Sequence, residues 1–374
     1  MSRADQPASL RLANGLELRT RPVSGRSTAA VALWWHAGRL HEQPDEAGAA
    51  HLIEHLVLEA LPAGRCARWG GAVNGQSGRE WTVWHALLPA ESAPEFLGTL
   101  ARALLAPLPP ASRLERECRV LAAETGGAAA RDLWEHCALR TAFGTHPVAR
   151  PLAVAAHPDR ERLAAFRARL LCGSRLRITA AGGLDPEALA AALRPLESLP
   201  AGSAEAPEPS VPALPARPGR HRIAAGTGAL WLLPFPAGDA AAVAVLAPLL
   251  ADPVLGALPR VLRDTREPLY GLHSEVEFCA GIGLWWLWAE DVGAAAALEA
   301  ALARRLAAGF APAELARARA WQRARRVLAG EDLLGCLEEL AGVRPAPPAR
   351  LPSASALART LAACWERRCL VLGS

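Results

Sequence analysis

The spacing of hydrophobic and polar positions along the chain alternates between strand-like and helix-like periods. Apolar runs of strand length lie at 28–36, 80–88, 175–181, 228–234, 269–278 and 282–289. A hairpin around an Asn-Gly turn is expected at 9–21. Helical spacing is found at 46–61, 91–106, 112–138, 159–171, 185–194, 238–251, 256–266, 293–308, 312–329 and 353–366. Strands mixed with long helices in both halves predict an α+β protein built from two domains of one plan.

A proline-rich segment divides the chain. Residues 199–219 read LPAGSAEAPEPSVPALPARPG, a composition that disfavours helix and sheet and is typical of a semi-stiff linker. We therefore expect a first domain at 1–198 and a second domain at 220–374. Both lengths lie within the usual range for a domain.

Composition removes several classes of function. All 41 basic residues are arginine, which excludes Schiff-base and P-loop chemistry, since both need lysine. The net charge of +4 is spread among acidic residues, so we expect no nucleic-acid partner. The eight cysteines form no CxxC pair, and the first residues lack the apolar stretch of a signal peptide. The most apolar run, 240–258, is broken by proline and aspartate. We expect a soluble cytoplasmic protein without a membrane partner.

The clearest chemical motif is HLIEH at residues 51–55. On a helix, His51 and His55 lie one turn apart and point the same way. Two imidazoles placed like this can bind one Zn²⁺ ion and leave room for a third ligand and a water. Glu54 could reach that water without binding the metal, which gives the H-x-x-E-H order of zinc peptidases. The motif therefore predicts a catalytic zinc site.

A third zinc ligand is expected on a neighbouring element. Glu117 and Glu124 lie seven residues apart in the segment LERECRVLAAET, so both carboxylates lie on one face of a helix. One could complete the zinc site while the other orients a ligand. Glu124 follows the apolar stretch VLAA, where an unpaired carboxylate would be costly, so it is the better ligand candidate. The alternative for Glu117 is a solvated helix glutamate.

The segment GRLHEQPDEAGAAHLIEHLVLEA resembles the zinc-motif region of the M16 peptidases, the family of pitrilysin, insulysin and the mitochondrial processing peptidase. The resemblance implies two similar domains, each a mixed or antiparallel sheet with helices packed on one face. It also implies that His51, His55 and Glu124 bind zinc and that Glu54 is the general base. Glu117 corresponds to a further family glutamate one heptad before the third ligand.

Two other segments extend the resemblance. GGAVNGQSGREWTVWHALLP is similar to the family's edge strand that receives the substrate backbone, with Asn74 kept and Gly75 in place of an alanine. LPRVLRDTREPLYGLHS resembles a second-domain segment whose arginine and tyrosine contact substrate, which implies that role for Arg263 and Tyr270. The alternative is a surface arginine and a tyrosine packed in a core.

Six further histidines have no ligand spacing along the chain, and most of them are interpreted as structural. They are His36, His41, His85, His136, His146 and His273.

The sequence therefore predicts a zinc-dependent metalloendopeptidase that cleaves peptides held extended in an enclosed chamber. Resemblance to the short, two-domain bacterial members implies a homodimer, or a heterodimer with a sister M16-like chain. Some short members trim precursor peptides, among them the PqqF-type proteins of pyrroloquinoline quinone biosynthesis. The alternatives are a non-catalytic M16-like subunit that binds peptide or scaffolds a partner, and an unrelated α+β protein with an accidental motif.

Overall fold

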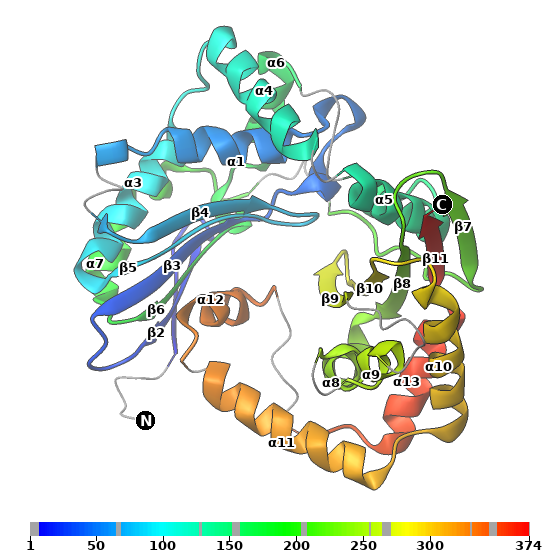
Figure 1. The fold of residues 1–374 in the computed structure, drawn as a ribbon. Helices are drawn as coiled ribbons and strands as arrows, with labels where there is room; N and C mark the ends of the chain where they lie inside the picture. The colour runs from blue at the N-terminus through cyan, green and yellow to red at the C-terminus, as the bar shows by residue number, and fades with distance from the viewer. Residues whose placement is uncertain are drawn as a thin grey trace. The chain divides into compact units, whose positions relative to one another are not determined.

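The chain forms two compact units (Figure 1). The computed structural model describes residues 7–64, 69–126, 129–151, 158–202, 208–253, 256–263, 271–329, 331–343 and 350–373. Unit 1 comprises Met1–Gly127, Leu152–Pro209 and Ala329–Arg344, and unit 2 comprises Ala128–Pro151, Ser210–Leu328 and Pro345–Ser374. One boundary falls inside the proline-rich segment 199–219. Unit 1 also includes Ala329–Arg344 from the second half of the chain, and unit 2 includes Ala128–Pro151 from the first half. The units are therefore not two consecutive stretches of sequence.

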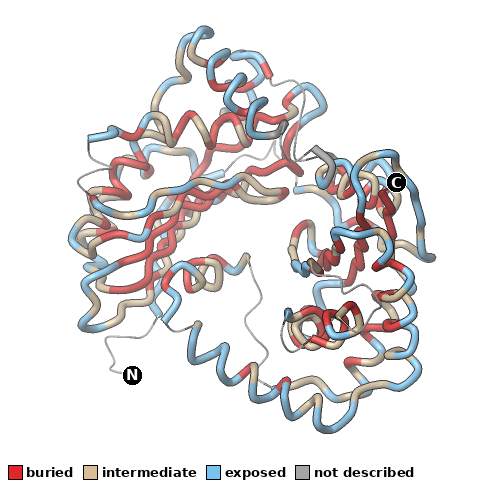
Figure 2. Tube along the Cα trace, in the orientation of Figure 1, coloured by how far each residue is buried: buried red, intermediate tan, exposed pale blue. Residues whose placement is uncertain are grey.

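Unit 1 is built on a six-stranded mixed sheet in the order β1-β2-β6-β3-β5-β4. The strands are β1 (Ala8–Arg11), β2 (Glu17–Pro22), β3 (Thr28–Trp35), β4 (Ala72–Ser77), β5 (Thr82–Pro89) and β6 (Leu176–Gly182). Only the β2–β6 pair is parallel. Side chains of the central strand β3 alternate between two buried faces, so Leu33 and Trp35 enter one core and Trp34 enters another. Figure 2 shows the central strands of this sheet as buried along most of their length.

Most helices of unit 1 contribute to the larger of these two cores. They are α1 (Ala49–Glu59), α3 (Ala93–Leu105), α4 (Ala111–Gly126), α6 (Arg160–Leu170) and α7 (Pro186–Ala192). One further helix, α12 (Leu333–Ala341), covers the opposite face of the sheet, where Leu333 and Leu337 pack with Trp34. Arg19 fixes α12 by donating to the backbone oxygen of Leu340 at 2.9 Å. The sequence analysis did not predict α12.

Unit 2 repeats this plan, which confirms the prediction of two similar α+β domains. Its sheet has the strand order β7-β11-β8-β10-β9, which corresponds strand by strand to β2-β6-β3-β5-β4 of unit 1. The pair β7–β11, equivalent to β2–β6, is parallel, and the other described pairs are antiparallel. The strands are β7 (Gly219–Ile223), β8 (Ala229–Pro236), β9 (Leu272–Cys279), β10 (Ile282–Ala289) and β11 (Cys369–Gly373). The helices are α5 (Ala129–Phe143), α8 (Ala240–Ala251), α9 (Ala257–Arg263), α10 (Ala294–Ala308), α11 (Pro312–Ala329) and α13 (Ala354–Glu366).

The helix expected at 112–138 corresponds to two elements, α4 and α5, which are assigned to different units. Residues 127 and 128 of the expected helix lie outside the described residues. Within the described ranges, every helix is too short or too polar to cross a membrane.

Candidate metal centre

Helix α1 carries the HLIEH motif, and a buried carboxylate holds its N-terminus. Glu42 accepts hydrogen bonds from the backbone N–H groups of Gly48 at 2.9 Å and Ala50 at 3.0 Å. Gly48 has a φ of +86°, a left-handed conformation that favours glycine. Arg39 pairs with the same carboxylate. A negative charge at this end of a helix satisfies free N–H groups and complements the helix dipole. The sequence analysis missed Glu42, whose only signal was an acidic residue ahead of the motif helix.

Replacing Glu42 by glutamine should destabilise the protein by about 2 kcal/mol, because one helix N–H loses its acceptor and buried Arg39 loses its partner. Chemical denaturation of both proteins measures the difference. Glu115 is an exposed glutamate on α4, so Glu115→Gln is the matched control and should change stability by less than about 0.5 kcal/mol. Equal stability of Glu42→Gln and wild type would show that the carboxylate does not hold the helix.

The side chains of His51, His55 and Glu124 converge. One donor atom from each lies within 4.8 Å of the other two. Glu124 reaches the pair from α4, with its Oε2 3.3 Å from Nε2 of His55 and 3.9 Å from Nε2 of His51. Two imidazoles and a carboxylate are the donor set of a catalytic zinc site with one open position. The three residues named from the sequence as ligands therefore come together in a geometry that fits zinc.

Glu117 lies behind this group. Its Oε2 is 3.8 Å from Nδ1 of His55, while Nε2 of the same ring faces Glu124. A carboxylate behind a histidine orients the ring and makes it a better metal ligand. The expectation that Glu124 sits in apolar surroundings is wrong, because its side chain is 53% exposed whereas that of Glu117 is 9% exposed. Leu121 between them turns into the core, so α4 buries its middle and exposes its end.

Glu54 is a buried carboxyl beside the histidines. It is 4% exposed, and its Oε2 lies 3.7 Å from Nε2 of His51. Trp84 donates to its backbone oxygen at 3.1 Å. Burial raises the pKa of Glu54 to about 7, and the charge of Glu124 adds to this effect. A carboxyl with a pKa near neutrality can both accept and return a proton at neutral pH.

Strand β4 passes directly over Glu54. In the described part of the sheet β4 pairs only with β5, so its other edge is open for backbone hydrogen bonds. A Cβ atom at Gly75 would lie 2.2 Å from Oε1 of Glu54, so the glycine leaves the room that this carboxylate occupies. Asn74 is exposed on the same strand and accepts from the N–H of Gly75 at 2.9 Å.

Of the two second-domain residues named from the sequence, only Arg263 lies within the described residues. Arg263 ends α9 in unit 2 and donates to the backbone oxygen of Pro253 at 3.1 Å. Tyr270 lies outside the described residues. A substrate contact by this pair stays a prediction.

Part of the chain matches a known peptidase family. Residues 22–156 match the family described as insulinase (peptidase family M16). An uncharacterized zinc protease of Mycobacterium tuberculosis is 28% identical over 201 residues. That match covers 50% of this chain and 46% of the relative, so it spans about half the relative's length.

Solved structures share the fold along the whole chain. A protease from Helicobacter pylori superposes with a TM-score of 0.81 at 16% identity, covering 99% of this chain and 100% of that one. A peptidase M16 inactive domain from Pseudomonas fluorescens gives a TM-score of 0.77 at 19% identity, covering 98% and 97%. The chain thus matches the M16 (insulinase) peptidase family over residues 22–156 and shares the fold of these two solved structures.

Proposed function

We propose that this chain is a zinc-dependent endopeptidase. The observation that carries the proposal is the convergence of His51, His55 and Glu124 beside the buried carboxyl of Glu54. Zinc held by these three ligands would act as a Lewis acid on the scissile carbonyl and make water more acidic.

Glu54 is the group that moves the proton in this proposal. It accepts a proton from the attacking water and returns it to the leaving amine. In the metal-free chain burial raises its pKa to about 7, and a zinc ion beside it would favour the carboxylate that accepts the proton. The open edge of β4 supports an extended substrate that adds as a further strand. Such binding reads the peptide backbone more than its side chains, and Asn74 would contact the added strand.

The remaining expectations complete the proposal. Arg263 and Tyr270 would bind substrate backbone near the scissile carbonyl and stabilise its developing charge. They would serve the zinc site of a partner chain, in a homodimer or in a heterodimer with a sister M16-like chain. A precursor peptide is the proposed substrate. All seven cysteines within the described ranges are free, which supports a reducing, cytoplasmic location.

Zinc affinity tests the ligand set. Glu124→Gln should weaken zinc binding by more than about 100-fold because a charged ligand is lost, and Glu117→Gln by about 10- to 100-fold because His55 loses its support. Competition with a chelator measures both, and Glu115→Gln on the same helix should bind zinc as wild type does. Unchanged affinity in Glu124→Gln would remove it from the ligand set. A chain that holds zinc at His51 and His55 yet cleaves no peptide, alone or with a partner, would favour the non-catalytic subunit.

Gly75→Ala should slow cleavage by about 10- to 100-fold without releasing zinc. The added methyl group occupies the place of Oε1 of Glu54, so the carboxyl must turn away from its position beside His51. Peptide cleavage and zinc content measure the two effects separately. Gly78→Ala is the matched control, because a Cβ atom there meets its nearest neighbour at an ordinary 3.5 Å. Equal loss of activity in both variants would mean that room for Glu54 is not what Gly75 provides.

A further inference from the structure

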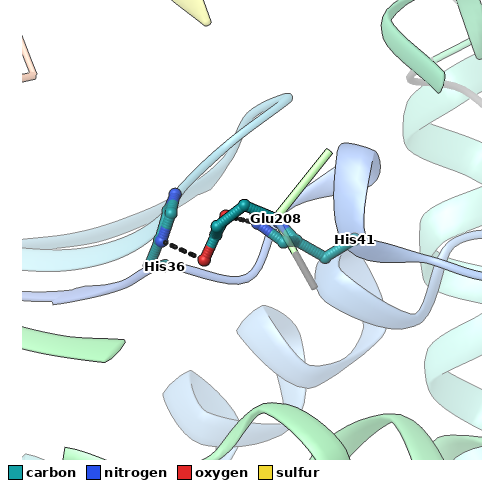
Figure 3. Close-up of side chains that lie close together, drawn as sticks. All are labelled: His36, His41 and Glu208. Atoms are coloured by element: carbon teal, nitrogen blue, oxygen red, sulfur yellow. Dashed lines mark hydrogen bonds and ion pairs between the residues drawn. The ribbon is translucent and has the colours of Figure 1, made fainter. Parts of the chain in front are cut away.

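Unit 1 contains a second group of metal-ligating side chains, formed by His36, His41 and Glu208 (Figure 3). His36 directly follows β3, His41 ends the short 3-10 helix Arg39–His41, and Glu208 lies in the proline-rich segment. One donor atom of each lies within 4.8 Å of the other two. The sequence analysis gave both histidines no metal role, since the third residue is 167 positions away from His41.

The donor spacing of this group fits a tetrahedral metal ion. His36 Nδ1 lies 3.5 Å from Oε1 of Glu208, and His41 Nε2 lies 3.2 Å from Oε2 of the same carboxylate. Zinc–ligand bonds of about 2.0 to 2.1 Å at tetrahedral angles place donors about 3.3 Å apart. In the HLIEH group one oxygen, Oε2 of Glu124, makes both contacts, at 3.3 and 3.9 Å. Here the two histidines face different oxygens of Glu208, at 3.5 and 3.2 Å, which is close to the tetrahedral donor separation.

His36 is held in place from its other side. Oε1 of Glu80 lies 3.1 Å from Nε2 of His36, and the ring stacks on Trp81 with centroids 4.4 Å apart. Nδ1 of the same ring faces the carboxylate of Glu208. A carboxylate behind an imidazole is the usual support of a metal-bound histidine.

We propose that His36, His41 and Glu208 bind a second divalent metal ion, and their two-nitrogen, one-oxygen donor set suits zinc. The ion is structural. It joins the proline-rich segment at Glu208 to the end of β3, which closes a long stretch of chain within unit 1. The inference stands on this group alone and goes beyond the proposed peptidase activity.

Arg175 sets the strength of this site. Its guanidinium donates to Oε1 of Glu208 and to the backbone oxygen of His36, both at 2.7 Å. It therefore holds the carboxylate in place and leaves Oε2 for the metal. Its positive charge repels the metal ion. In the HLIEH group the neighbouring side chains are instead the carboxyls of Glu54 and Glu117. We expect weaker zinc binding here than at the HLIEH group.

His41 binds the metal through Nε2. In the metal-free protein its Nδ1 accepts from the N–H of Gly38 at 3.2 Å, so Nε2 carries the proton and donates it to Glu208. Coordination through Nε2 moves the ring proton to Nδ1. Both hydrogen bonds are then given up, and the N–H of Gly38 must turn away from the ring, a cost that the free energy of metal coordination has to exceed.

Zinc stoichiometry tests the proposal. The full-length wild type, saturated with zinc and freed of excess metal, should contain about two zinc ions per chain, and His51→Gln/His55→Gln should retain about one. Adding Glu208→Gln to that double variant should reduce the content to about zero. His41→Gln should do the same, and His136→Gln is the control, since that ring bonds a backbone oxygen in unit 2. The visible absorption of tetrahedral Co²⁺ in the double variant gives a second measurement that does not depend on cleavage.

Glu208 has a half-exposed side chain, so its variant should fold even if buried His41 cannot be replaced. The proposal is overturned if the His51→Gln/His55→Gln protein holds no zinc, or if its zinc survives Glu208→Gln. The three residues would then be a metal-free hydrogen-bonded anchor. If instead the HLIEH group does not bind zinc, the chain still holds zinc that depends on Glu208 and not on His51. The two failures therefore give different results.

Discussion

Glu54→Gln is expected to abolish peptide cleavage while leaving zinc bound. Glutamine has nearly the shape of glutamate but cannot accept a proton, so the rate should fall by about 1,000-fold. The side chain of Glu54 lies 3.7 Å from Nε2 of His51 but is not one of the three proposed zinc ligands, so zinc should stay bound. Turnover of an unstructured peptide and the zinc content of the same preparation measure the two halves of this prediction.

Glu115→Gln is the control for this loss of activity, since that glutamate is exposed on α4. It should cleave at the wild-type rate. If Glu54→Gln kept its activity, another group would have to move the proton. If it lost zinc together with activity, its effect would be explained by the metal and not by proton transfer.

The metal-free protein should lose stability as the pH rises from about 4.5 to about 7. Glu54 has a folded-state pKa of about 7, above its ordinary value of 4.5. The folded state therefore holds more protons than the unfolded state in this window, and the free energy of unfolding falls as the pH rises. At pH 8 the full difference corresponds to about 3 kcal/mol. Denaturation of stripped protein across this range measures it.

Glu54→Gln removes this ionisation. The stripped variant should therefore be more stable than stripped wild type above pH 7, by about 3 kcal/mol, and similar to it near pH 4.5. Added zinc should reduce the difference, because a nearby cation favours the carboxylate. If the difference in stability between stripped wild type and the stripped variant were the same at pH 5 and at pH 8, the buried position of Glu54 would be contradicted.

Local spacing was sufficient to predict the histidine pair. A helix fixes the direction of His51 relative to His55, so the motif alone placed both rings on one face. Strands were also predictable from local runs of apolar residues, and β10 was predicted at its observed bounds of 282–289. The exposure of Glu124 was not predictable in this way, because it depends on where α4 leaves the core.

Residues that act across long sequence separations escaped the sequence analysis. Helix α12 has the pattern of any short amphipathic helix, and nothing local indicates that it covers a sheet built by the first half of the chain. Glu42 and Glu208 are likewise single acidic residues in loops. Their roles follow from the helix end and the histidines that the fold brings to them.

The central claim is that zinc held by His51, His55 and Glu124 makes this chain a peptidase. It is tested most directly by stripping the full-length protein with a chelator and following peptide cleavage as zinc is returned. The account predicts that cleavage disappears on stripping, returns as zinc is restored, and stays absent in His51→Gln at every zinc concentration. Cleavage that survives stripping, or a fully zinc-loaded wild type that cleaves nothing, would contradict it.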